Sequence, residues 1–362
     1  MKRFKWVAAL VMAGCLLMMP EVALNAAREA MTSWASSVAP ALFPFMALMP
    51  LLTCDDAARA YEALLGRIVR PLFRLPGAAA PAVLTGMAAG SPAGAMAAVR
   101  VASASGLRRG QLERLVICVG GLSPAFLVSG IGVGMLGSAA DGWILLRAQL
   151  GAQFILLLAT RGMRADGPSV PDCGIDAAAG VGSAVGSVLG VCGYMMLFNI
   201  IGAILSAWTG GAAGTALLCL LDLPSGAQAV AKLGLAREIR LPLLAAMSGF
   251  GGLCIAAQNL SACTRAGVRP SRYFAGRIAG AGLMSGLAAL QIHLPEVRVE
   301  APAALPTAAL AVCALAIPVC FQTIRNFLLT KENAQKELLM EAKKGEKAQD
   351  IVDERERANN IM

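Results

Sequence analysis

The chain has 362 residues, of which 57% are hydrophobic and 15% are charged, and its formal net charge is +9. Ordinary soluble domains hold about 45–50% apolar and about 25% charged residues, and a water-soluble fold could not cover this much apolar side chain. The composition excludes a soluble enzyme and favours a polytopic membrane protein. The positive excess lies in short loops between apolar runs, which suits membrane topology better than nucleic-acid binding.

Residue types that carry chemistry are sparse. The 10 Cys are scattered, mostly within apolar runs, and the single His293 has no second imidazole to share a metal with. The sequence contains no CxxC, HExxH, GxSxG or Walker A motif, and no expected span carries paired carboxylates. We therefore expect no metal, no cofactor and no catalytic residues, so the protein is not expected to be an enzyme.

The first apolar run follows three basic residues and ends at Pro20. It predicts an uncleaved first transmembrane helix over residues 1–20, with a signal peptide or a lipoprotein leader as the alternatives. Residues 21–37 have mixed polarity and predict an interfacial helix, and residues 38–52 are again apolar. Residues 55–74 carry four Arg and predict a cytoplasmic interfacial helix.

Two of the later apolar runs, 77–99 and 115–137, are interrupted by Gly and Pro, and residues 143–160 form a further expected span. A polar loop at 161–176 separates this half of the chain from the next. The second half holds further apolar runs at 177–208, 212–223, 241–263, 279–294 and 306–329, followed by a charged tail at 331–362.

Lys- and Arg-rich loops favour the cytoplasm. This rule places the N-terminus, the tail and the basic segments 100–114, 161–164, 232–240 and 265–277 on the cytoplasmic side of the plasma membrane. All these segments can lie on one side only if 77–99 and 241–263 are re-entrant hairpins and if 212–223, although short, crosses the membrane. It predicts about seven to nine spans, with both termini in the cytoplasm.

The two halves resemble each other weakly. Residues 84–94 align with 244–252, and residues 105–108 align with 266–269 at nearly the same offset. The expected fold is an all-α polytopic membrane protein with two broken segments in two related halves. Its parts are the first helix (1–20), gate-like repeat 1 (21–160), a connecting loop (161–176), gate-like repeat 2 (177–330) and the cytoplasmic tail (331–362).

Broken helices point to a binding site. In hydrocarbon, unpaired backbone survives only where protein or water covers it, and paired broken segments in two halves mark a midplane solute site. The candidate substrate-binding residues are Gly90, Ser91, Pro92, Gly94, Ser123, Pro124, Gly249, Gly251, Gly252, Gln258 and Asn259. The alternative is that these glycines only let helices pack closely.

Several motifs, in order, resemble the YlbJ-type sporulation integral membrane proteins. They are the stretches at 19–28 and 38–45, the Gly-Ser-Pro-Ala-Gly motif at 90–94, and the glycine-rich stretch at 249–258. That family is similar to the nucleoside-recognition, or gate, domain group. The resemblance implies a sporulation membrane protein with a solute-transport or permeation role. The family usually carries Tyr where this chain has Ser91, and Asn where it has Gly120, Gly121 and Leu122. Backbone groups therefore bind the solute, the ligand differs, or this copy is structural.

Two functions remain open at this point. The first is a transporter- or permease-like protein for an unknown small polar solute, which the resemblance implies is nucleoside-like. It expects the glycines at 90, 94, 249, 251 and 252, with Pro92, to line one polar cavity. The alternative is a membrane scaffold for spore assembly that binds a protein partner through its tail. Neither involves nucleic acid, and both are embedded in the lipid bilayer.

Overall fold

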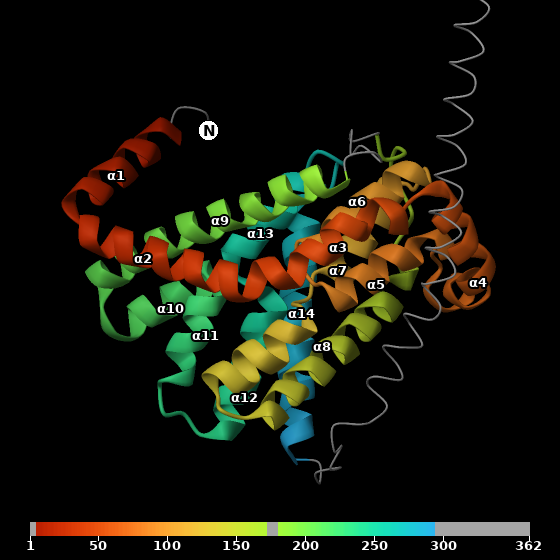
Figure 1. Cartoon of the computed structure of the whole chain (residues 1–362). Helices are drawn as coiled ribbons and strands as arrows, with labels where there is room; N and C mark the ends of the chain where they lie inside the picture. Colours follow the sequence, from red (N-terminus) through yellow and green to blue (C-terminus); the bar gives the residue numbers. More distant parts are fainter. Residues whose placement is uncertain (1–4, 172–179, 294–362) are drawn as a thin grey trace, which may run out of the picture. The chain divides into compact units, whose positions relative to one another are not determined.

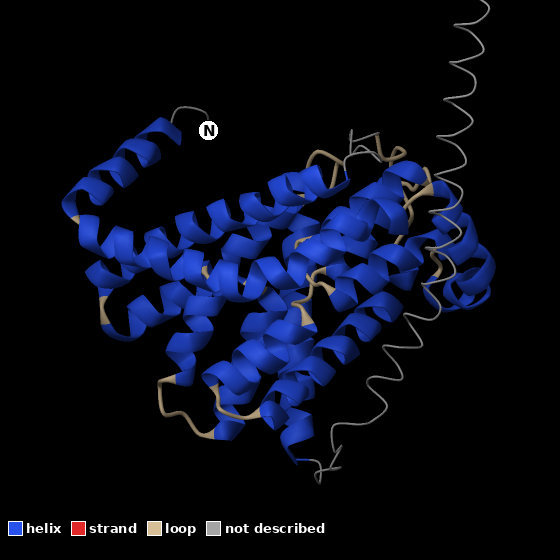
Figure 2. Cartoon of the chain, in the orientation of Figure 1, coloured by secondary structure: helices blue, strands red, loops and turns tan. Residues whose placement is uncertain are grey.

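The computed structural model describes residues 5–171 and 180–293, which form helices joined by turns (Figures 1 and 2). These two ranges contain no β-strand, only an isolated bridge between Arg108 and Ser169. The expected all-α class is confirmed for them. The predicted last span at 306–329 and the tail at 331–362 lie outside the described residues. By length and composition, four helices could cross a membrane: Pro20–Leu52, Ala139–Gly162, Val181–Thr209 and Arg237–Cys263.

Within residues 5–171, the first half contains twelve helical elements, counting the short first helix and the short 3-10 and π-helical turns. They are α1 (Lys5–Met18), α2 (Pro20–Ser33), η2 (Trp34–Val38), α3 (Ala39–Leu52), α4 (Asp55–Phe73), η3 (Gly77–Ala79), α5 (Ala80–Ala88), α6 (Ala93–Ala104), α7 (Arg109–Val119), η4 (Phe126–Met135) and α8 (Ala139–Ala159), which ends in the 3-10 turn η5 (Thr160–Gly162). α2, η2 and α3 form one continuous helix. The predicted interfacial helix at 21–37 is therefore the first part of a long apolar helix. The π-helical turn η2 lies directly before Pro40, whose missing N–H would interrupt a regular α-helix.

The second half contains six helices among the described residues. Its helices are α9 (Gly180–Thr209), α10 (Gly211–Leu221), α11 (Leu223–Ala231), α12 (Arg237–Phe250), α13 (Gly252–Cys263) and α14 (Pro270–His293). In the first half the long helix α2–α3 is followed by α4, by the short pair α5 and α6, by the segment α7–η4, which is broken in the middle, and by the long helix α8. In the second half α9 leads directly to the short pair α10 and α11, then to the broken segment α12–α13 and to α14 (Figure 1).

Two pairs of short helices form tight hairpins. α5 packs on α6 because Gly86 faces Gly94, where an added Cβ would lie 2.5 Å from the Gly86 Cα. α10 packs on α11 in the same way, since a Cβ on Gly226 would lie 2.5 Å from the Cys219 Cα. Residues 77–99 thus fold into the expected hairpin. Residues 212–223, predicted to cross, instead supply the first arm and the tip of a second hairpin.

Ion pairs mark two ends of the bundle. At the Glu113 end, Glu113 binds Arg269, and the backbone N–H of Arg109 and Gly110 donate to residues 168 and 166. At the Asp141 end, Asp141 binds Arg237 at 2.7 Å. α8 connects the two ends, and its 21 residues span about 30 Å.

These ends correct two predictions. The broken segment α12–α13 begins with Arg237 at the Asp141 end and leads into Arg269 at the Glu113 end. It therefore runs from one end of the bundle to the other, and the hairpin predicted for 241–263 is wrong. The basic segments 161–164 and 232–240 lie at opposite ends of α8, not at one end of the bundle as their shared cytoplasmic placement predicted. The hydropathy and charge rules failed here because a hairpin and a crossing of equal length have the same composition.

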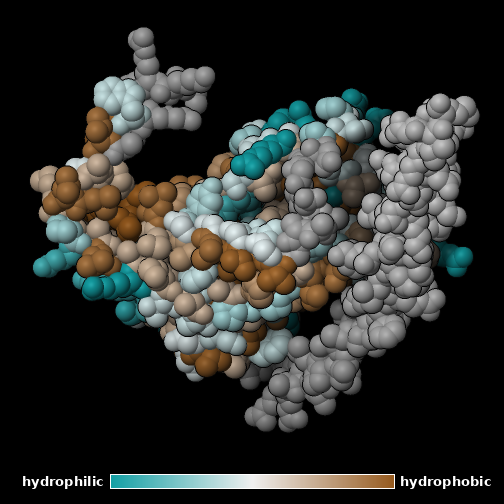
Figure 3. Space-filling view, turned by 45° about the horizontal axis from the view of Figure 1, so that its top comes forward, coloured by the Kyte–Doolittle hydropathy of each residue, from teal (hydrophilic) through white to brown (hydrophobic). Residues whose placement is uncertain are grey.

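Large apolar side chains remain exposed on several helices, as expected of a surface that faces lipid. Leu17 is 84% exposed and Ile278 is 65% exposed. Figure 3 shows broad hydrophobic areas on one face, with hydrophilic side chains gathered toward the edges. In water such areas would be costly, whereas in a bilayer they are the contact surface. The chain is a multi-pass integral membrane protein.

The packing of α12 on α14 gives a first prediction. A Cβ on Gly249 would lie 2.6 Å from the Ala281 Cα and 2.7 Å from the Gly280 carbonyl oxygen. We expect Gly249→Ala to separate these helices and to destabilise the protein by about 1–3 kcal/mol. Gly286→Ala is the matched control, because Gly286 has no atom within 4 Å of an added Cβ. Thermal unfolding in detergent measures both, and equal melting temperatures would contradict the packing.

Candidate functional site

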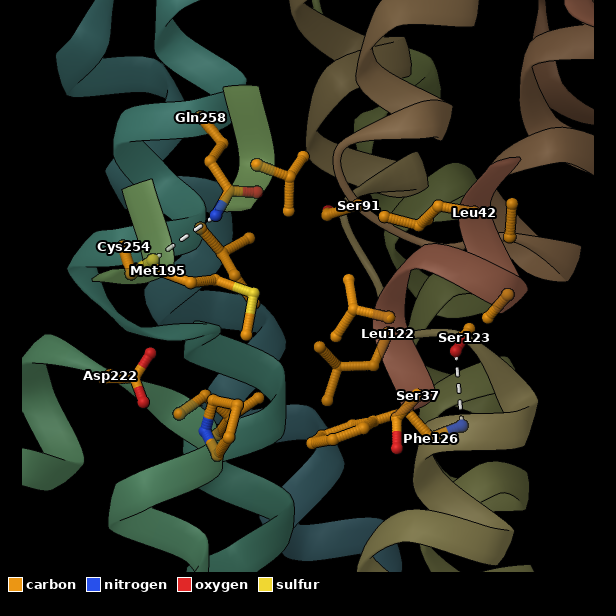
Figure 4. A pocket seen from close by; sticks show the side chains of 17 residues that line it. Ser37, Leu42, Ser91, Leu122, Ser123, Phe126, Met195, Asp222, Cys254 and Gln258 are labelled. Carbon is orange, nitrogen blue, oxygen red and sulfur yellow. Dashed lines mark hydrogen bonds between the residues drawn. The ribbon is translucent and has the colours of Figure 1, made fainter. Parts of the chain in front are cut away.

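A cavity of about 70 Å³ lies where the two hairpin tips approach the two broken segments (Figure 4). Its polar side chains are Ser91 from the first hairpin, Asp222 from the second, Ser123 and Gln258 from the broken segments, and Ser37 from η2. The rest of the wall is mainly apolar. A water needs about 10–15 Å³ of such space, so the cavity has room for a few waters or a small polar group.

The tip of the first hairpin docks on the first break. The backbone N–H of Ser91 donates to the Gly121 carbonyl oxygen at 2.7 Å. Gly90 has a φ of +73°, and a Cβ there would lie 2.5 Å from the Leu122 carbonyl carbon. Only glycine combines this left-handed backbone with so close an approach.

Gln149 on α8 braces the same break from the other side. Its Oε1 accepts from the Leu122 N–H at 2.7 Å, and its Nε2 donates to the Leu122 carbonyl at 2.8 Å. The residue is only 1% exposed. One buried amide therefore replaces both backbone partners that Leu122 loses where the helix is interrupted.

Arg277 on α14 braces the second break. Its Nε donates to the Phe250 carbonyl at 3.0 Å, and its side chain is buried. Phe250 ends α12, so the guanidinium lies at the negative end of that helix dipole. No carboxylate in the described ranges forms an ion pair with it. The prediction that Arg277 belongs to a cytoplasmic loop is therefore wrong.

The tip of the second hairpin docks on this second break. Gly251 and Gly252 both have positive φ, at +87° and +75°. An added Cβ on Gly252 would lie 3.3 Å from the Leu223 nitrogen, beside the α10–α11 junction. At that junction Asp222 caps α11: its Oδ2 accepts from the Ser225 N–H at 3.2 Å and from the Ser225 Oγ at 2.6 Å.

Asn259 links the two halves. Its Nδ2 lies 3.2 Å from the Ser91 Oγ on the first hairpin and 3.0 Å from the Tyr273 hydroxyl on α14. The side chain is 1% exposed, and its Oδ1 has no hydrogen-bond partner among the described residues. The predicted candidates Ser91 and Asn259 are thus in direct contact although they lie far apart in the sequence.

The predicted site residues fall into three groups. Ser91, Ser123 and Gln258 line the cavity, and Asn259 lies directly behind Ser91. The predicted glycines form the breaks and the close helix contacts and do not line this cavity; they are Gly90, Gly94, Gly249, Gly251 and Gly252. Pro124 is half-buried and lines none of the three cavities.

A second cavity of about 270 Å³ adjoins the first. Pro92, the remaining predicted residue, lines it together with Tyr194 and Arg265. Val191 and Gln258 line both cavities, so their side chains form the partition between them. The second cavity approaches the lower end of the about 300–1,000 Å³ that is usual for small-molecule pockets.

Sequence reasoning missed Asp222, Cys254 and the two braces, Gln149 and Arg277. A signal for Asp222 was present: an Asp followed by Leu-Pro-Ser inside an apolar run is a helix N-cap sequence. The roles of Gln149 and Arg277 had no local signal, because each depends on a contact with a distant part of the chain.

The fold defines a multi-pass membrane protein, and one segment of the chain matches a known family model. Residues 35–139 match the Gate family model, described as nucleoside recognition. This segment contains the first hairpin and the first broken crossing.

The chain is also similar to a curated protein, the sporulation integral membrane protein YlbJ of Bacillus subtilis (strain 168). The two are 32% identical over 129 residues, which is 36% of this chain and 32% of that protein. The matched part therefore spans about a third of the relative's length. The resemblance read from the sequence motifs is confirmed over this region. No solved structure matches the chain.

Proposed function

We propose that the protein is a transporter-like membrane protein that holds a small polar solute among its four helix interruptions. The observation that carries this proposal is the cavity that both hairpin tips and both broken segments share. Interrupted helices leave backbone groups and half-helix ends free to contact a solute, and transporter sites are commonly built in this way. The name of the matched relative supports a role in sporulation, at the plasma membrane or a membrane derived from it.

We further propose that the two halves are inverted repeats. The hairpins enter from opposite ends: the first from the Glu113 end and the second from the Asp141 end. Gly90 and Asp222 are equivalent tips, Gly120 and Gly251 equivalent breaks, and Gln149 and Arg277 equivalent braces, all at nearly the same spacing in the sequence. This register replaces the predicted alignment of 84–94 with 244–252, which pairs a hairpin with a crossing segment.

The match to a nucleoside-recognition model favours a nucleoside-like solute. The 70 Å³ cavity is too small for one unless it joins the larger neighbouring cavity. Movement of Gln258 and Val191, which separate the two, would join them. The amide of Gln258 would then face the solute and offer it both a donor and an acceptor.

Native cysteines provide the test. Cys254 and Cys263 lie on the same helix and are both buried, at 1% and 0% exposed, but only Cys254 lines the cavity. In a cysteine-free background with one of the two restored, we expect the small aqueous reagent methanethiosulfonate ethylammonium to modify Cys254 in vesicles. The Cys263 protein should remain unmodified.

Mass spectrometry of the intact protein gives the readout. Equal protection of both cysteines would argue against a water-accessible site, and it would favour the alternative of a membrane scaffold. A metabolite-uptake screen that compares overexpressing and deletion strains then identifies the solute. If the two strains take up every metabolite equally although Cys254 is modified, the protein has a water-accessible cavity but does not transport.

A further inference from the structure

We propose that Asp222 is the proton-binding group of this cavity, so that occupancy of the site is coupled to protonation of one carboxylate. The inference deepens the proposed function, on which its role in coupling rests. Asp222 lies at the tip of the second hairpin, and its carboxylate faces the cavity (Figure 4). The residue is 2% exposed.

Capping of α11 uses only one of the two oxygen atoms of the Asp222 carboxylate. Both hydrogen bonds from Ser225 go to Oδ2, and Oδ1 accepts none from the described residues. Serine or asparagine would cap α11 equally well without a charge. A carboxylate buried at membrane depth is costly when ionised, and such groups commonly mark proton or ion pathways.

Among the residues that the structure describes, none places a fixed counter-charge against Asp222. No Lys or Arg in the described ranges forms an ion pair with it. Of the described elements, six make up or pack against the α10–α11 hairpin, and two of them, α11 and η4, carry no titratable or charged side chain. The other four carry Cys192 and Tyr194 (α9), Cys219 (α10), Arg237, Glu238 and Arg240 (α12), and Cys254 and Cys263 (α13). Of these, only Cys254 shares the cavity wall with Asp222.

A proton fits this site better than a metal ion does. No group of three His, Cys, Asp or Glu among the described residues could hold a metal. Protonation needs only one oxygen: an O–H bond forms at Oδ1 with a proton from water in the cavity, and it breaks to return that proton to water. The hydroxyl of Ser225 donates to Oδ2 and receives a hydrogen bond from Asn199, which holds the carboxylate in one orientation.

Infrared difference spectroscopy of the full chain in liposomes tests the proposal. Asp222→Asn keeps the helix cap and removes the ionisable group, so we expect an unchanged melting temperature. Between about pH 9 and about pH 5, the wild type should gain a protonated-carboxyl band that this variant lacks. Identical difference spectra for the two proteins would overturn the proposal.

A second experiment tests whether Asp222 and Cys254 share one cavity. In the protein that retains Cys254 alone, methanethiosulfonate ethylammonium adds a positive charge to the cavity wall, and the neutral methyl reagent does not. The cationic label should move the carboxyl transition to lower pH, since a nearby cation favours the ionised form. No difference between the two labels would overturn the shared site.

The two proposals can fail separately. If Cys254 is modified while Asp222→Asn leaves the infrared spectra unchanged, the proton site is wrong and the solute site stands. If Cys254 is protected while the Asp222 band is present, the solute site is wrong and the buried carboxylate still titrates.

Discussion

Replacing Gln149 with leucine is expected to cause one of the two largest losses of stability. Gln149→Leu leaves both the N–H and the carbonyl of Leu122 without a partner, since each now bonds the Gln149 amide. A buried unsatisfied group costs about 1–3 kcal/mol, and two are created here. We expect a clearly lower melting temperature in detergent and a smaller folded fraction in the membrane.

Gln153→Leu is the matched control. Gln153 lies one turn further along α8 and is also buried, but neither of its amide atoms has a hydrogen-bond partner among the described residues. The same substitution should therefore change the stability by less than about 1 kcal/mol. Similar losses for the two variants would mean that Gln149 does not brace the break.

The second large effect concerns Glu113, whose side chain is 0% exposed. Its two oxygens accept from the Arg269 N–H at 3.1 Å, from Nε at 2.8 Å and from an NH2 nitrogen at 2.7 Å. These bonds tie α7 to the turn that precedes α14. Glu113→Gln removes the charge that holds the arginine, and we expect it to cost about 1.5–3 kcal/mol, the usual range for hydrogen bonds to a charged group.

The exposed pair of Asp56 and Arg59 on α4 is the control for this effect. Ion pairs in water contribute about 0–1 kcal/mol, so Asp56→Asn should leave the melting temperature nearly unchanged. Chemical unfolding of both variants gives the comparison. A Glu113→Gln protein as stable as the Asp56→Asn protein would contradict a structural role for the Glu113–Arg269 pair.

Much of the helical order could be predicted from the sequence. Hydropathy and helix-breaking residues gave the membrane class, and they located the interruptions near Pro92, Pro124 and Gly251. The contact between Ser91 and Asn259 follows the expectation that broken segments from the two halves meet. These features depend on local sequence and on the need to pair backbone groups in lipid.

The path of the chain between the interruptions could not be predicted in the same way. The short run 212–223 was expected to cross because nothing in its composition distinguishes a crossing from one arm of a hairpin. The close approach of Gly226 to Cys219 decides the matter, and this contact depends on the residues beyond Asp222. Arg277 was assigned to a loop because basic residues precede it, although its partner is the distant Phe250 carbonyl.

Cross-linking of the first hairpin to the second broken segment, beside the cavity, tests the central claim most directly. Cysteines would replace Ser91 and Asn259 in a cysteine-free chain with a protease site between residues 171 and 180. A short bis-methanethiosulfonate reagent should then hold the two cleaved halves together until reductant is added. If they separate as readily as in either single-cysteine protein, the interruptions do not meet and the shared cavity does not exist.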